Sequence, residues 1–150
     1  IEVVLNPTSI VHSLVRLRDG ATLAHLGYPD MRVPISFALT YPARTATPLA
    51  PLDFTSLTLA FEAPDLETFP LLALAREAGE RRGTYPAIFN AANEVAVSAF
   101  LAGRLPFLGI AGAGADALEH ADGAPARDVD ELLETDAAAR RLVEQGLSVA

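Results

Sequence analysis

The sequence predicts an α+β fold: a small sheet with a hairpin and a helix, a proline-rich connector, and a C-terminal α-helical bundle. Two apolar segments flank Asp19-Gly20, a dipeptide typical of tight β-hairpin turns. Prolines interrupt residues 42–53, and after Pro64 the sequence becomes rich in Ala and Leu at helical spacing. The chain therefore divides into three predicted parts: residues 1–41, a connector with one strand at 42–66, and a helical bundle at 67–150.

The first part contains the predicted sheet. Residues 1–5, IEVVL, are a short apolar segment that Asn6-Pro7 ends, which suits a buried strand. Residues 10–18 and 21–28 form the predicted hairpin. A two-residue turn would pair Arg18 with Ala21, Leu14 with His25, and His12 with Gly27.

That pairing gives the hairpin two different faces, because side chains alternate along each strand. The face expected to meet the core carries Val11, Val15, Leu17, Ala24, Leu26 and Tyr28. The opposite face is mixed and suits solvent, a partner or a ligand. It carries His12, Leu14, Arg16, Arg18, Leu23 and His25.

A short helix is predicted after the hairpin. Asp30 is placed to cap a helix that begins near Met31, Pro34 is tolerated in the first turn, and Pro42 ends it. The connector that follows is expected to be extended, and residues 57–61 are its one strand candidate.

Four helices are predicted after the connector. The first covers residues 70–82 and ends at Gly83, as helices often do. The second runs from a cap at Asn90 to about residue 102, and its apolar composition predicts a central place in the bundle. The third covers about residues 108–121.

The last helix is predicted to begin at Asp128, which forms a capping-box pattern with Glu131. A second cap at Thr135 or Asp136 predicts a break in this helix before residue 137.

Composition excludes several classes of function. The 150 residues form one domain, or one small domain with an appendage, and their net charge of −8 lies mostly after residue 63. An acidic chain without a basic cluster is a poor ligand for nucleic acid. The 11 cations are all Arg, which excludes lysine chemistry, and without Cys there are no disulfides or thiolate metal sites. No apolar run is long enough to span a membrane.

Residues 112–117 match the GxGxxA pattern of dinucleotide-binding sites. Such a site requires a strand directly before the glycines and an acidic residue after the next strand. Residues 106–111 are a weak strand candidate, and no strand is predicted after them. Close packing of small residues in a helix is therefore favoured over an NADPH site, and a helix spanning Gly109 to Leu118 would exclude the nucleotide interpretation.

His12 and His25 share the mixed face of the predicted hairpin, diagonal to each other and roughly 7–8 Å apart at Cβ. Two imidazoles can begin a metal site, but no third ligand is evident. The favoured interpretation is one histidine at the edge of the core and one in solvent. The C-terminal acids lack the ligand spacing of a calcium loop, and Asn90 with Glu94 is explained by capping and hydrogen bonds within the bundle.

Two stretches resemble a known family: NPTSIVHSLVRLRDGATLAHLGYPDMRVPI at residues 6–35 and NAANE at residues 90–94. They resemble 1-deoxy-D-xylulose 5-phosphate reductoisomerase, an NADPH-dependent enzyme of isoprenoid-precursor synthesis. The resemblance runs from end to end of the chain but covers only the family's C-terminal portion. It implies that residues 1–41 are the C-terminal part of the catalytic α/β domain. It also implies that the nucleotide-binding domain and the metal-ligand carboxylates lie upstream of Ile1.

The resemblance implies a complete, cytoplasmic enzyme that converts 1-deoxy-D-xylulose 5-phosphate into 2-C-methyl-D-erythritol 4-phosphate. A divalent cation, Mg²⁺ or Mn²⁺, would act as Lewis acid, and NADPH would supply the hydride. The present chain alone is expected to be inactive and to bind neither cofactor tightly. Its hairpin sheet is the expected homodimer surface.

Four residues acquire a role near the substrate or cofactor from the resemblance: Ser9, His12, Pro29 and Met31. SIVHS and PDMR match family segments beside the substrate pocket and the nicotinamide, and Ser9 is included only through its matched motif. From the residues alone, Pro29 to Met31 is a turn with a helix cap and a methionine that fills the core. No catalytic or metal-ligating residue is expected in this chain.

Two alternatives remain open. The chain could be a stand-alone module that uses its mixed hairpin face and acidic bundle to dimerise or to bind another protein. It could instead be a different NAD(P)-binding enzyme that uses residues 112–117. An upstream nucleotide-binding domain would exclude the first alternative.

Overall fold

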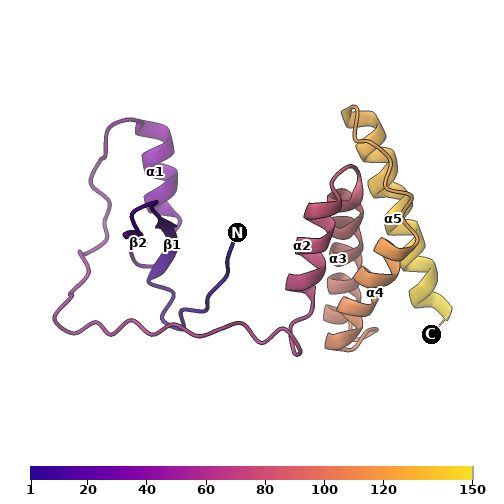
Figure 1. Cartoon of the computed structure of the whole chain (residues 1–150), viewed down its shortest axis with the longest axis horizontal. Helices are drawn as coiled ribbons and strands as arrows, with labels where there is room; N and C mark the ends of the chain where they lie inside the picture. Colours follow the sequence, from indigo (N-terminus) through magenta and orange to yellow (C-terminus); the bar gives the residue numbers. More distant parts are fainter. Residues whose placement is uncertain (150) are drawn as a thin grey trace. The chain divides into compact units, whose positions relative to one another are not determined.

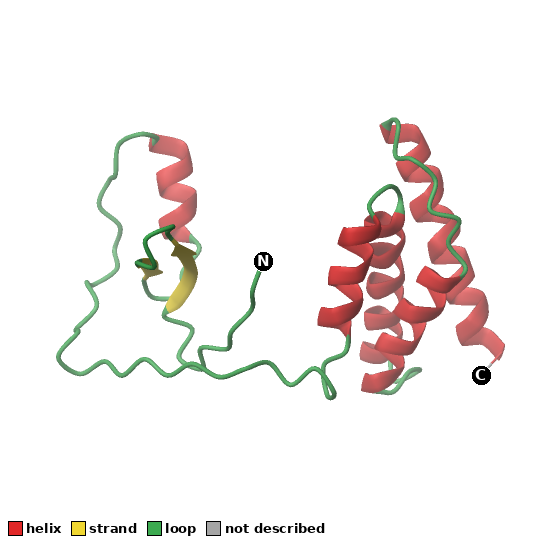
Figure 2. Cartoon of the chain, viewed as in Figure 1, coloured by secondary structure: helices red, strands yellow, loops and turns green. Residues whose placement is uncertain are grey.

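The computed structural model describes residues 1–149 and confirms the α+β fold class, with a small hairpin and a set of helices (Figure 2). The chain forms two compact units, Ile1–Pro64 and the residues from Asp65 onward. The first contains β1 (Val11–Arg16), β2 (Thr22–Leu26) and α1 (Arg32–Thr40). The second contains α2 (Leu71–Arg81), α3 (Tyr85–Leu101), α4 (Phe107–Glu119) and α5 (Val129–Val149) (Figure 1).

The hairpin turn contains three residues instead of the predicted two. The backbone N–H of Leu17 donates to the carbonyl of Ala21 at 2.8 Å, which leaves residues 18–20 in the loop. Gly20 has a φ of 90°, a conformation that glycine adopts without steric cost. Three-residue hairpin loops commonly end in such a residue.

The longer turn shifts the register and makes the predicted pairing wrong. Leu14 lies opposite Ala24, where the prediction placed His25. Val15 lies opposite Leu23, so the predicted core face is also wrong: Leu23 shares the face of Val15, and Ala24 lies on the other.

β1 also contains a bulge at its start. Val11 pairs with Leu26 and Ser13 pairs with His25, so His12 is an extra residue in β1. Two residues of one strand then face a single residue of the other, which is the definition of a β-bulge.

The two further strands predicted in the first unit are wrong. Residues 1–5 and 57–61 do not form strands, and the nearest pairing is a single antiparallel bridge between Leu5 and Glu62. Its two hydrogen bonds measure 2.9 and 3.0 Å. A strand needs a continuous neighbour for its backbone groups, and residues 1–64 provide none for either segment.

α1 agrees with the prediction. Met31 is the residue just before the helix, and the Asp30 carboxylate accepts the backbone N–H of Arg32 at 2.9 Å. The helix runs to Thr40, just before Pro42. Ile10, at 6% exposure, is the one buried residue in the described residues of this unit.

α3 is the central helix of the second unit, as predicted, because it packs against α2, α4 and α5 (Figure 1). It begins at Tyr85, after Thr84 and with Pro86 in its first turn, where proline is well tolerated. The predicted cap at Asn90 is therefore wrong. Asn90 lies inside the helix and donates a 3.2 Å hydrogen bond to Glu94.

Small residues let the helices approach closely in this unit. Four alanines of α3 are completely buried: Ala91, Ala92, Ala96 and Ala99. The main apolar cluster joins α3 to α4 and α5, and its buried members are Ile88, Ala91, Ala92, Ala117, Ala139 and Val143. Such close packing leaves little room for larger side chains.

α5 begins as predicted but is continuous. The Asp128 carboxylate accepts the backbone N–H of Glu131 at 2.8 Å, as an N-terminal cap does. The predicted break near residue 136 is wrong. Thr135 donates its hydroxyl to the carbonyl of Glu131 inside the helix, and Asp136 pairs with Arg140 one turn later.

Arg140 also ties α5 to α3. Its guanidinium donates to Glu94 and to Asp136, each at 2.6 Å, and Asn90 donates to the same Glu94 carboxylate. The hydrogen bonds to Glu94 lower its pKa below the ordinary value of 4.5, and the bond from Arg140 has the larger effect.

This cluster predicts a specific loss of stability in acid. Because folding lowers the pKa of Glu94, its contribution is complete above pH 4.5 and is lost as the pH falls through the folded-state pKa. We expect Glu94→Gln to weaken the pH dependence of stability below pH 4.5, measured by denaturant unfolding from neutral to acidic pH. Glu119→Gln, at the end of α4, should keep the parent profile. Parallel profiles for the parent and Glu94→Gln would contradict this assignment.

Candidate functional site

The first unit contains a cavity of about 510 Å³, here called the hairpin–helix cavity. It is lined by His12 of β1, by residues 25–31, and by Val33 and Pro34 of α1. The bulge, the end of β2 and the start of α1 therefore each contribute to one space, although these elements are separate in the sequence.

This cavity contains three of the four residues that the sequence singled out: His12, Pro29 and Met31. Met31 is 69% exposed, so it does not fill the core of this unit, as the simpler interpretation expected. Its thioether chain is instead available to a molecule that enters the cavity.

Ser9 does not line the hairpin–helix cavity. It lines a second cavity, of about 430 Å³, which also includes His12. The Asn6 side-chain oxygen accepts the backbone N–H groups of Ile10 and Val11 at 3.0 and 3.2 Å and so holds this loop. Ser9 adopts a φ of 53°, which is uncommon for a residue other than glycine and occurs often near functional sites.

Asp30 is the one carboxylate that lines the hairpin–helix cavity, and Arg32 neutralises it. Arg32 Nε donates to Asp30 Oδ1 at 2.9 Å, and a terminal guanidinium nitrogen donates to Oδ2 at 2.6 Å. The Arg32 side chain is the main reason that the pKa of Asp30 falls from 3.8 to about 2. Asp30 therefore stays ionised and paired, and is poorly suited to exchange protons with a ligand.

The rings of His12 and His25 lie beside each other. Their ring centroids are 5.5 Å apart, with the planes inclined by 50°. His12 Nε2 lies 3.1 Å from the carbonyl oxygen of Gly27, and since a carbonyl only accepts, this nitrogen carries the proton in that bond. Sequence reasoning did not place His25 at the site. In the structure His25 lines the cavity beside His12, the extra residue of the β1 bulge, and no sequence pattern marks that bulge.

Residues 1–149 contain no group of three or more His, Cys, Asp or Glu side chains arranged to hold a metal ion. His12 and His25 therefore lack a third protein ligand, and a stable site needs one.

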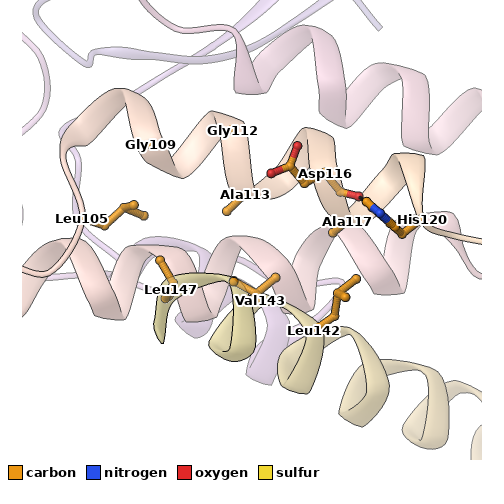
Figure 3. Close-up of a pocket in the computed structure, with 11 residues that line it drawn as sticks. Leu105, Gly109, Gly112, Ala113, Asp116, Ala117, His120, Leu142, Val143 and Leu147 are labelled. Atoms are coloured by element: carbon orange, nitrogen blue, oxygen red, sulfur yellow. Dashed lines mark hydrogen bonds between the residues drawn. The ribbon is translucent and has the colours of Figure 1, made fainter. Parts of the chain in front are cut away.

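The second unit has a cavity of about 350 Å³ between α4 and α5 (Figure 3). Small residues of α4, among them Gly112 and Ala113, face Val143 and Leu147 of α5. α4 spans Phe107–Glu119, so the GxGxxA pattern lies inside a helix and the nucleotide interpretation is excluded.

His120 follows the last turn of α4 at the edge of this cavity (Figure 3). Its Nδ1 lies 2.8 Å from the carbonyl oxygen of Asp116, where a ring N–H satisfies a backbone acceptor at the helix end. In the part of the chain that the structure describes, no helix has both the length and the apolar character needed to cross a membrane.

The geometry defines an α+β protein in which a bulged hairpin and one helix form a histidine-lined cavity, and a separate helical bundle follows. The chain belongs to the family described as the DXP reductoisomerase C-terminal domain, whose model matches residues 26–142.

Curated relatives agree with this family. A 1-deoxy-D-xylulose 5-phosphate reductoisomerase of Chloroherpeton thalassium is 49% identical over 95% of this chain and 37% of its own length. That of Ralstonia nicotianae is 47% identical over 100% of this chain and 38% of its own length. The chain thus spans well under half the length of the curated relatives that it matches.

Solved structures are similar as well. The reductoisomerase from Zymomonas mobilis in complex with NADPH has a TM-score of 0.91 and 42% identity, over 97% of this chain and 39% of that one. A DOX-P reductoisomerase in complex with NADPH, fosmidomycin and magnesium has a TM-score of 0.89 and 36% identity, over 97% and 38%.

Proposed function

We propose that this chain is the C-terminal part of an NADPH-dependent reductoisomerase, which converts 1-deoxy-D-xylulose 5-phosphate into 2-C-methyl-D-erythritol 4-phosphate. The observation that carries this proposal is the identity of 47–49% to reductoisomerases over nearly the whole chain. The complete enzyme would act in the cytoplasm, in isoprenoid-precursor synthesis.

His12, Pro29 and Met31 would form one wall of the substrate and nicotinamide pocket. They line one cavity, and the exposed Met31 with the ring of Pro29 offers an apolar surface that excludes water from a bound substrate. Ser9 would contribute from the adjoining cavity that it shares with His12. In this proposal residues 1–41 belong to the catalytic domain, 42–66 form the connector, and 67–150 are the supporting helical bundle.

Within residues 1–149 the chain provides a complete binding site for neither cofactor. Residues 1–149 have no three-ligand metal cluster, and the glycine pattern of α4 lies inside a helix. The proposal therefore places the Mg²⁺ or Mn²⁺ ligands and the NADPH domain in the portion of the relatives that this chain does not cover. There the cation supplies Lewis-acid stabilisation, and NADPH supplies the hydride.

The hairpin would be the homodimer surface. Val15 and Leu23 lie opposite each other on one face and are 55% and 61% exposed, as suits residues that a partner covers. Leu14, on the other face, is 43% exposed.

The test is NADPH consumption by the complete protein with 1-deoxy-D-xylulose 5-phosphate and Mg²⁺. We expect turnover, and we expect Met31→Ala to raise KM by about 3–10-fold, because it removes apolar contact with the substrate. Leu39→Ala is the matched control, since Leu39 is 82% exposed on α1 and does not line the cavity.

The 150-residue chain by itself should consume no NADPH. An inactive complete protein would contradict the proposed reaction and favour a stand-alone interaction module. Turnover by the 150-residue chain alone would contradict its role as a supporting part.

A further inference from the structure

We infer that His25 is a further residue of the substrate site, where its ring positions His12 so that His12 can bind a substrate hydroxyl group. This inference rests on the proposed function, because it concerns the same cavity.

The bulge in β1 is the first observation. It places both His12 and Ser13 opposite His25, where a regular strand would place one residue. Bulges often occur beside active sites because they redirect a side chain. Here the redirected side chain is His12, and the hairpin–helix cavity includes both imidazoles.

The second observation is that His12 is held from two sides. Its Nε2–H is committed to the carbonyl oxygen of Gly27, at 3.1 Å. Its ring packs against the ring of His25, with centroids 5.5 Å apart. The hydrogen bond fixes one nitrogen, and the ring of His25 restricts rotation about that bond.

This arrangement leaves one nitrogen of His12 available. In neutral imidazole with a protonated Nε2, Nδ1 is an acceptor. A sugar phosphate presents hydroxyl groups, each of which can donate a hydrogen bond to such an acceptor. Rotation of the unsupported ring would move Nδ1 away from the hydroxyl and weaken binding.

The charged groups around the pair do not provide an alternative anchor for His25. The other titratable side chains that line the cavity are Tyr28 and Asp30, and Arg32 occupies Asp30. Within residues 1–149 no hydrogen bond or ion pair holds the His25 ring, whereas the His12 ring contacts it directly. His25 therefore acts through His12.

The test uses the complete enzyme with His25→Ala and His25→Phe. We expect His25→Ala to raise KM for 1-deoxy-D-xylulose 5-phosphate by roughly tenfold, with less than about a twofold change in kcat, because a binding contact is misplaced. His25→Phe keeps a planar ring against His12 and should restore KM to within about twofold of the parent. His120→Ala, in the other unit, is the matched control and should behave as the parent.

A second readout is the nitrogen NMR signal of the His12 ring. The parent should show the Nε2-protonated tautomer, and His25→Ala should show a mixture of tautomers. A structural role alone would lower the active fraction, and hence kcat, without raising KM. An unchanged KM in His25→Ala would overturn the inference, and so would a KM in His25→Phe as high as that in His25→Ala. Neither result would contradict the proposed reaction. A parent protein that does not oxidise NADPH would overturn the proposed function and, with it, this inference.

Discussion

Gly123→Ala is expected to destabilise the helical unit by about 2–5 kcal/mol. Gly123 has a φ of 67°, and a Cβ atom there would overlap the ring of Tyr85. The left-handed conformation costs an alanine about 1–2 kcal/mol, and overpacking adds about 1–3 kcal/mol. The same junction contains Gly83, whose Cβ would lie 2.6 Å from the carbonyl oxygen of Ala124. Denaturant unfolding followed by helical circular dichroism measures the effect.

Two other glycines separate the causes. Gly103 has a φ of 70° but open space around it. Gly103→Ala should therefore lower the free energy of unfolding only through the left-handed backbone conformation, by about 1–2 kcal/mol. Gly79 lies inside α2 with no close neighbour, and Gly79→Ala should stabilise the unit by about 0.5–1 kcal/mol. If Gly123→Ala costs no more than Gly103→Ala, the packing against Tyr85 is not as tight as the structure indicates.

Ala92→Leu is expected to destabilise the same unit by about 1–3 kcal/mol, because the added carbons have no space to enter. Ala92 is completely buried in the cluster that includes Ala117 of α4 and Val143 of α5. Thermal unfolding should show the loss as a lower midpoint. Ser98→Leu adds a similar side chain at an exposed position of α3 and should leave the midpoint nearly unchanged.

An unchanged midpoint in Ala92→Leu would mean that the helices separate at little cost. In that case the small residues of α3 would not be what sets the spacing of the bundle.

The helices were predictable because each carries enough periodic apolar residues to identify it. α4 and the central place of α3 followed from composition and spacing alone. The start of α3 was not predictable in this way, because Asn90 is a good helix cap when the sequence is considered alone. The helix instead begins at Tyr85 with Pro86 in its first turn, although the Thr84 side chain makes no capping hydrogen bond, and the added turn brings Ile88 into the core.

The hairpin shows what sequence leaves open. Asp19-Gly20 suits both a two-residue turn and a three-residue turn that ends in glycine, and one residue of difference exchanges the two faces. His12, Pro29 and Met31 were identified by resemblance to a family, whereas His25 depends on the bulge. No local pattern predicts a bulge, because it reflects how the whole strand pair accommodates its neighbours.

The single buried residue of the first unit, Ile10, has a consequence for how this chain melts. Burial of apolar surface is the main source of folding free energy, so residues 1–64 by themselves gain little stability from it. The helical unit, in contrast, has a packed apolar core. Amide hydrogens of the hairpin will exchange with solvent long before those of α3. Any single melting temperature measured for this chain describes the helical unit alone.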